Sequence, residues 1–137
     1  MVKEIIRDVN LLQIKAEDAV KEDIDGVAQD LLDTLQANSH RCIGMAANMI
    51  GVNKRVIIAA IGPLQVVMFN PQLIAKRGPY QTEEGCLSLT GQRATTRYQQ
   101  IKVRFYNDQW QVQELALTGF PAEIVQHELD HCDGILI

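Results

Sequence analysis

The segment Gln126-His127-Glu128-Leu129-Asp130-His131, close to the end of the chain, contains the pattern H-E-x-x-H. On a helix, residues four apart project from the same face, so the imidazoles of His127 and His131 can both reach one metal ion about 2 Å away. Glu128 then lies beside the ion, where it can accept a proton from water and pass it to a leaving amine. The alternative is an amphipathic helix with ordinary polar histidines. Because two of only three histidines have this spacing around a glutamate, we expect a metal site with hydrolytic chemistry.

This pattern falls in a predicted helix that begins near Gly119 and ends before Gly134. Pro121 is tolerated in a first turn, and the Thr118 side chain is a candidate cap for the helix start. Gly134 is typical of the position just after a helix end.

A second helix is predicted over residues 20–37, where apolar residues recur at the helical spacing: Ile24, Val27, Ala28, Leu31 and Leu35. Between the two helices, short apolar or alternating runs predict strands over residues 55–61, 65–69, 72–76, 82–89, 100–106 and 111–117. This order of helix, many short strands and helix predicts an α+β fold with helices packed on antiparallel sheets.

The composition is that of an ordinary globular protein, with 137 residues, 47% of them hydrophobic and 22% charged. We therefore expect one domain over residues 1–137. The net charge of −4 and the lack of a basic stripe argue against nucleic acid or an anionic membrane as partner. The charged N-terminus lacks the apolar core of a signal peptide, so we expect a cytoplasmic protein. An odd number of cysteines, three, argues against a disulfide framework.

A hydrolytic metal site usually has three protein ligands, and the two histidines leave one to be found. The candidates are Asp130, His40, the glutamates and the cysteines. Cys86 directly follows Gly85, which permits close approach of another group. Cys42 and Cys132 lie among apolar neighbours, where a buried structural thiol is the usual case, and burial statistics alone favour the same interpretation for Cys86.

Two motifs together resemble those of the peptide deformylase family: Glu84-Gly85-Cys86-Leu87-Ser88-Leu89, followed by the H-E-x-x-H helix of residues 126–131. A third family segment, G-x-G-x-A-A-x-Q, is present in altered form as Cys42-Ile43-Gly44-Met45-Ala46-Ala47-Asn48-Met49. The resemblance covers the chain from about residue 42 to its end. It implies antiparallel β-sheets packed around a C-terminal metal-binding helix, with an N-terminal helix.

The resemblance also implies the chemistry. Cys86, His127 and His131 would hold one divalent ion, Fe(II) in the cell, with Zn, Ni or Co able to substitute. Glu128 would be the general acid and base in removing the formyl group from the N-terminal formyl-methionine of newly made polypeptides, some of them ribosome-associated nascent chains. The backbone N–H of Leu87 would stabilise the oxyanion.

Substrate contacts are implied in the same way. Gly44 and Gly85 would offer backbone groups to an extended peptide, and Arg93 would hold the chain. Ile43, together with Phe120 and Ile124, could line a pocket for the methionine side chain.

The chain departs from the family pattern at Met49, where the family has a glutamine that donates a hydrogen bond to the oxyanion. A thioether cannot donate one. Asn48 could supply the donor only if the backbone presents it inward. Two interpretations follow, a working deformylase with a modified oxyanion site and a divergent paralogue that binds metal or formyl-peptide with little turnover. A zincin-type protease does not account for the Cys86 motif.

Overall fold

The computed structural model describes residues 1–137 and contains a five-stranded antiparallel sheet with the strands in sequence order. The strands are β1 (Gly44–Ala46), β2 (Val56–Ile61), β3 (Leu64–Cys86), β4 (Leu89–Tyr106) and β5 (Val112–Thr118). The helices are α1 (Val9–Leu12), α2 (Ile24–Ala37) and α3 (Gly119–Cys132), and two short 3₁₀ turns, η1 (Lys21–Asp23) and η2 (Ala47–Ile50), complete the regular structure. The α+β prediction is confirmed.

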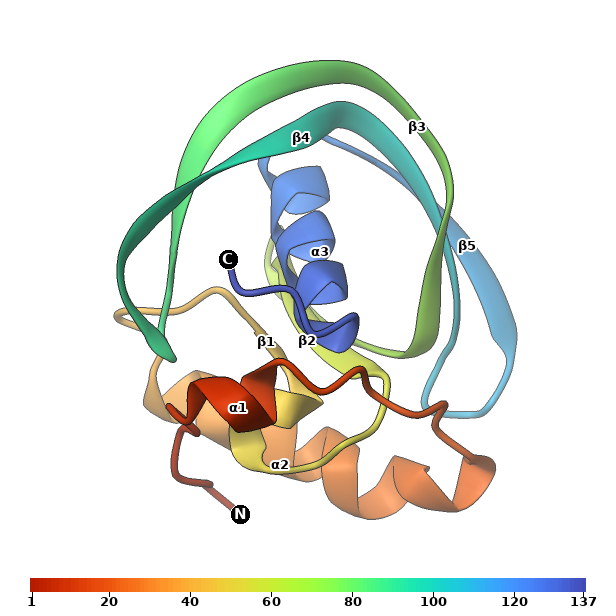
Figure 1. Cartoon of the computed structure of the whole chain (residues 1–137). Coiled ribbons are helices and arrows are strands. Elements are labelled where there is room, and N and C mark those ends of the chain that lie inside the picture. Colours follow the sequence, from red (N-terminus) through yellow and green to blue (C-terminus); the bar gives the residue numbers. More distant parts are fainter.

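The long hairpin of β3 and β4 bends over α3, as Figure 1 shows, so that the helix lies inside the curve of the sheet. Two predicted strands, at residues 65–69 and 72–76, are in fact parts of β3. The predicted strand at 82–89 is the end of β3, the two-residue turn and the first residue of β4, and the predicted sheets are one. The pairing of β3 with β4 shifts register between Phe69 and Gln72 and again between Leu73 and Ala75. Irregularities of this kind bend a strand without ending it. The Asn70-Pro71 pair that predicted a strand end marks the first of these bends.

Helix α3 is buried along most of its length, including both of its histidines and Glu128. Its apolar residues Ala122, Val125 and Leu129 belong to the same core as the sheet residues Ile57 and Phe105. Burial of this apolar surface stabilises the helix in its position, by roughly 25 cal/mol for each Å² removed from water. The polar residues of the H-E-x-x-H pattern are therefore held on a rigid support.

The predicted ends of α3 are partly right. Gly134 has φ +75°, the left-handed conformation expected just after a helix. Thr118 occupies the N-cap position with extended backbone, as predicted, but its side chain makes no capping hydrogen bond. The residue that follows it, Gly119, has φ +63°, and this turn of the backbone directs the chain from β5 into the helix.

The N-terminal region lies beneath the sheet, and both α1 and α2 lie toward the foot of the molecule in Figure 1. Helix α2 buries Leu31, Thr34 and Leu35, and it starts after η1 rather than at Val20 as predicted. The short helix α1 is capped by the Asp8 side chain, which accepts from the Asn10 N–H at 2.9 Å. None of the helices is long and apolar enough to cross a membrane.

Candidate metal centre and active site

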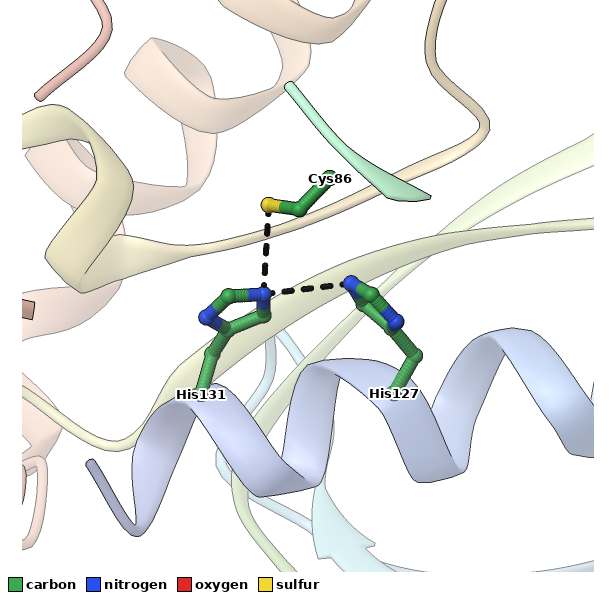
Figure 2. Close-up of side chains that lie close together, drawn as sticks. All are labelled: Cys86, His127 and His131. Atoms are coloured by element: carbon green, nitrogen blue, oxygen red, sulfur yellow. Dashed lines mark hydrogen bonds between the residues drawn. The ribbon is translucent and has the colours of Figure 1, made fainter. Parts of the chain in front are cut away.

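Three ligand atoms from two elements converge at the end of β3. His127 and His131 lie one turn apart on α3, and Cys86 is the last residue of β3 (Figure 2). The Cys86 Sγ is 3.3 Å from His131 Nε2, which is 3.1 Å from His127 Nε2. All three atoms lie within 4.8 Å of one another. The sequence motifs predicted this grouping.

Cys86 is placed by a tight turn. It pairs with Leu89 across the β3–β4 hairpin, so only Leu87 and Ser88 connect the strands. The Ser88 N–H donates to the Cys86 sulfur at 3.4 Å. This hydrogen bond holds the sulfur in place at the turn, and the thiolate is the form of cysteine that binds metals.

The donor set fits a divalent transition-metal ion. The Glu84 carboxylate lies 2.8 Å from His127 Nδ1, and since an ionised carboxylate only accepts, Nδ1 carries the proton. With its Nδ1 proton donated to Glu84 in a hydrogen bond, His127 has Nε2 free to face the His131 Nε2 and the shared centre. One thiolate and two imidazole nitrogens around a common centre suit Zn²⁺ or Fe²⁺ and leave a position open.

Arg97, on β4, holds the carboxylate behind His127. Its guanidinium donates to both oxygens of Glu84, at 2.9 and 2.7 Å, and to Asp130 at 2.7 Å. Burial alone would raise the pKa of Glu84, but the hydrogen bonds from His127 and Arg97 outweigh it and lower this pKa to about 2. The carboxylate therefore stays ionised and keeps His127 oriented.

Glu128 is buried beside the metal centre, and its Oε1 has no hydrogen-bond partner. Burial raises the pKa of its carboxyl to about 7. Gly44, in β1, allows this close packing: a Cβ there would lie 2.9 Å from Glu128 Oε2 and 2.8 Å from Ile124 Cγ2. The free carboxylate oxygen is thus available to a water molecule or a substrate.

A cavity of about 250 Å³ opens onto the metal centre. Its lining includes most of the residues predicted from the sequence, namely Ile43, Gly44, Met49, Gly85, Cys86, Leu87, Phe120, Ile124, His127 and Glu128. Arg93 does not line it. The Arg93 guanidinium instead lies 3.5 Å from the carbonyl of Thr90, to which it donates.

Met49 is buried, and its sulfur accepts from the Ala46 N–H at 3.5 Å. Asn48 does not replace the missing donor, because its Nδ2 donates to the backbone carbonyl of His131 at 2.9 Å. The inward presentation of Asn48 that the sequence left open is therefore not found.

The other two cysteines are not part of the metal centre. Cys132 is buried in the core, as expected, and burial raises the pKa of its thiol to about 12. Cys42 is half-buried in the wall of the cavity, where its thiol donates to the Gly44 carbonyl at 2.7 Å. Burial also raises the pKa of Cys42 to about 12, so it stays a thiol.

Two residues of the site were missed by sequence reasoning. Arg97 is 13 positions from Glu84 and 33 from Asp130, so no local pattern joins them. Arg7, near the N-terminus, donates to the Leu87 carbonyl at 3.0 Å and supports the turn next to Cys86. Only the fold brings these partners together.

Comparison with known proteins agrees with the resemblance found in the sequence motifs. A model of the polypeptide deformylase family matches residues 3–137. A peptide deformylase of Clostridium beijerinckii is 47% identical over 137 residues, all of both chains. A class I type b peptide deformylase of Acinetobacter baumannii, solved with Met-Ala-Ser bound, superposes with a TM-score of 0.88 at 30% identity, over 99% of this chain and 97% of the other.

The same Acinetobacter baumannii protein has been solved with actinonin bound, and that structure gives a TM-score of 0.85 at 32% identity, over 98% of this chain and 94% of the other. The match thus extends over the whole length of both proteins. Together with the intact cysteine and two histidines, it establishes that this chain belongs to the peptide deformylase family of metal-dependent hydrolases.

Proposed function

We propose that this chain removes the formyl group from the N-terminal formyl-methionine of newly made polypeptides, releasing formate and a free amine. The observation that carries the proposal is a buried carboxylate, Glu128, beside three converging metal ligands at the base of an open cavity. The relative solved with Met-Ala-Ser holds a tripeptide that begins with methionine, as such a product would. Residues 1–137 would act as one deformylase domain in the cytoplasm, where nascent chains emerge.

Cys86, His127 and His131 would hold the metal ion, which we take to be Fe(II) in the cell, with Zn, Ni or Co able to substitute. When bound, the ion supplies positive charge that makes a water molecule more acidic and polarises the formyl oxygen. The thiolate donates charge to the ion and moderates its Lewis acidity.

Glu128 would move the proton. Its carboxyl, with a pKa of about 7, can accept a proton from water and later return it, because a proton carrier works best when its pKa is near the working pH. As the water oxygen attacks the formyl carbon, Glu128 takes the proton. It then gives this proton to the departing nitrogen, which becomes the new amino terminus.

The Leu87 backbone N–H is the group we propose as donor to the oxyanion. It lies between Cys86 and Ser88 in the two-residue turn, and Arg7 fixes the carbonyl of the same residue. A donor held in place before the reaction stabilises the developing charge without reorganisation.

The peptide would lie along the edges formed by Gly44 and Gly85, whose backbone groups line the cavity. Ile43, Phe120 and Ile124 would contact the methionine side chain. Arg93, outside the cavity, would reach later residues of the peptide.

Glu128→Gln provides the test. Protein loaded anaerobically with Ni(II) or Fe(II) is assayed with formyl-Met-Ala-Ser, and the metal content of each sample is measured. We expect the variant to keep one equivalent of metal and to lose turnover by at least about 10²-fold, since an amide cannot carry the proton. Near-normal turnover by the variant would contradict the role of Glu128. A wild-type protein that holds metal but barely turns over would favour the paralogue with little activity.

A further inference from the structure

The outer edge of β1 carries backbone groups that have no partner in the sheet. β1 is the first strand of the sheet and pairs only with β2. The carbonyl of Ile43, just before β1, accepts from the Ala60 N–H of β2 at 2.9 Å. Because the direction of hydrogen bonding alternates along an antiparallel strand, the backbone groups of Gly44 and Ala46 point away from β2. Gly44 also lines the cavity, so its carbonyl is open to a peptide laid along this edge.

Two sulfur side chains of the same segment cover this edge. The Cys42 thiol donates to the Gly44 carbonyl at 2.7 Å. The Met49 thioether accepts from the Ala46 N–H at 3.5 Å. A thiol is a weak donor and a thioether a weak acceptor, whereas a peptide N–H is a strong donor. A peptide that binds as an added strand can therefore take the Gly44 carbonyl from Cys42.

The cavity wall beside Gly44 also contains a polar atom without a partner. Glu128 is buried, and its Oε1 accepts no hydrogen bond. A Cβ on Gly44 would lie 2.9 Å from Glu128 Oε2, so the Gly44 backbone is next to the proposed proton carrier. A buried polar atom that lacks a partner indicates a place for water or a ligand. The carbonyl that Cys42 covers is thus adjacent to the place where the reacting group would lie.

We propose, on the basis of the deformylase function above, that Cys42 sets the affinity for the peptide by competing with it for the Gly44 carbonyl. In the free protein the thiol holds this carbonyl, and in the complex a backbone N–H of the peptide replaces the thiol. Binding then exchanges one hydrogen bond for another and gains only the difference between them. The family pattern has a glycine in place of Cys42, and glycine has no side chain that could compete.

Infrared spectroscopy follows the Cys42 S–H bond directly. At neutral pH both Cys42 and Cys132 keep their protons, because burial raises the pKa of each thiol to about 12. Cys86 gives no S–H band in Zn-loaded protein, since a metal-bound cysteine is a thiolate. The S–H stretching bands of Zn-loaded wild type are recorded with and without Met-Ala-Ser. The band that Cys42→Ala or Cys42→Ser lacks is the Cys42 band.

We expect the Cys42 band to move to higher wavenumber when Met-Ala-Ser binds, because an S–H bond stiffens when its hydrogen bond is lost. Cys132 is the internal control: it is buried in the core, so its band should not move. A Cys42 band that stays in place at saturating peptide would overturn the proposal, since the thiol would still hold the carbonyl.

The dissociation constant of Met-Ala-Ser, from calorimetric titration of the Zn-loaded protein, measures the competition. Cys42→Ala should bind the peptide about three- to tenfold more tightly, the range expected for one hydrogen bond. Cys42→Ser should bind no more tightly than wild type, because a hydroxyl is a stronger donor and 2.7 Å suits it. Ser39→Ala, which removes an exposed hydroxyl outside the cavity, is the matched control and should leave the value within about 1.5-fold.

Equal affinity of wild type and Cys42→Ala would refute the competition. A gain in Cys42→Ser as large as that in Cys42→Ala would refute it too, because the size of the sulfur and not its proton would then be the cause. Neither measurement requires turnover. A wild type that binds Met-Ala-Ser with the expected band shift but does not deformylate formyl-Met-Ala-Ser would contradict the proposed function alone. Absence of Met-Ala-Ser binding by both wild type and Cys42→Ala would overturn the role of Cys42.

Discussion

Met49 is the residue at which this site differs most from a complete oxyanion pocket. Its buried thioether lines the cavity and accepts from Ala46, so it offers the reacting oxygen no proton. We predict that Met49→Gln raises kcat toward formyl-Met-Ala-Ser by about 10- to 100-fold, since one oxyanion donor is worth about 10²–10³ in rate. The measurement is steady-state kinetics at equal metal loading.

Met45→Gln is the control for this substitution, because Met45 is equally buried in β1 but does not line the cavity. It should bring no gain in rate. If Met49→Gln folds, binds metal and shows no gain either, the account of the missing donor is wrong.

The sequence alone predicted those site residues that belong to short motifs. Cys86, His127 and His131 converge as predicted because two lie four apart on one helix and the third ends a strand whose tip lies beside them. Arg97 could not be predicted, since an arginine in an alternating strand normally faces water. Its burial depends on two carboxylates from other elements.

The contact between the end of α3 and α1 gives a prediction at the scale of elements. Gly134 has φ +75°, and a Cβ there would also lie 2.8 Å from the carbonyl carbon of Gln13. Gly134→Ala should therefore destabilise the protein in two ways, through the left-handed backbone, at about 1–2 kcal/mol, and through overpacking, at about 1–3 kcal/mol. Urea unfolding followed by circular dichroism measures the sum.

Gly91→Ala separates the two effects. Gly91 has φ +74° with nothing within 4 Å of its would-be Cβ, so only the backbone cost of about 1–2 kcal/mol applies. Equal losses of stability in the two variants would show that α1 does not pack against the end of α3 in the way described.

Secondary structure was predictable where a periodic pattern extended over several turns, as in α2 and α3. It was not predictable at Asn70, which has φ +54° inside β3 and whose amide bridges to the backbone of Ala19. A sequence containing Asn-Pro indicates a turn, and only the pairing with β4 on either side of it shows that the strand continues.

Arg97 joins three elements of the molecule through ion pairs. It lies on β4, and its partners Glu84 and Asp130 lie on β3 and α3. Arg97→Met leaves a buried carboxylate without its cation. We predict a loss of about 3–5 kcal/mol in the free energy of unfolding, and about 10- to 100-fold weaker metal binding through the loosened His127. Urea unfolding and competition with a chelator measure the two effects.

Arg104→Met is the matched control, because Arg104 pairs with Glu114 on the exposed side of the same strand. Its removal should change stability by no more than about 1 kcal/mol and leave metal affinity as it was. If the two variants lost similar stability, the buried network would not be what joins sheet and helix.

The central claim, that Cys86, His127 and His131 bind one ion, is tested most directly by the absorption spectrum of Co(II)-substituted protein. A sulfur-to-cobalt charge-transfer band in the near ultraviolet should saturate at one equivalent in the wild type. In Cys86→Ser this band should vanish, while the visible bands of cobalt held by the two histidines persist at lower affinity. The same near-ultraviolet band in wild type and Cys86→Ser, or no stoichiometric cobalt in the wild type, would contradict the account.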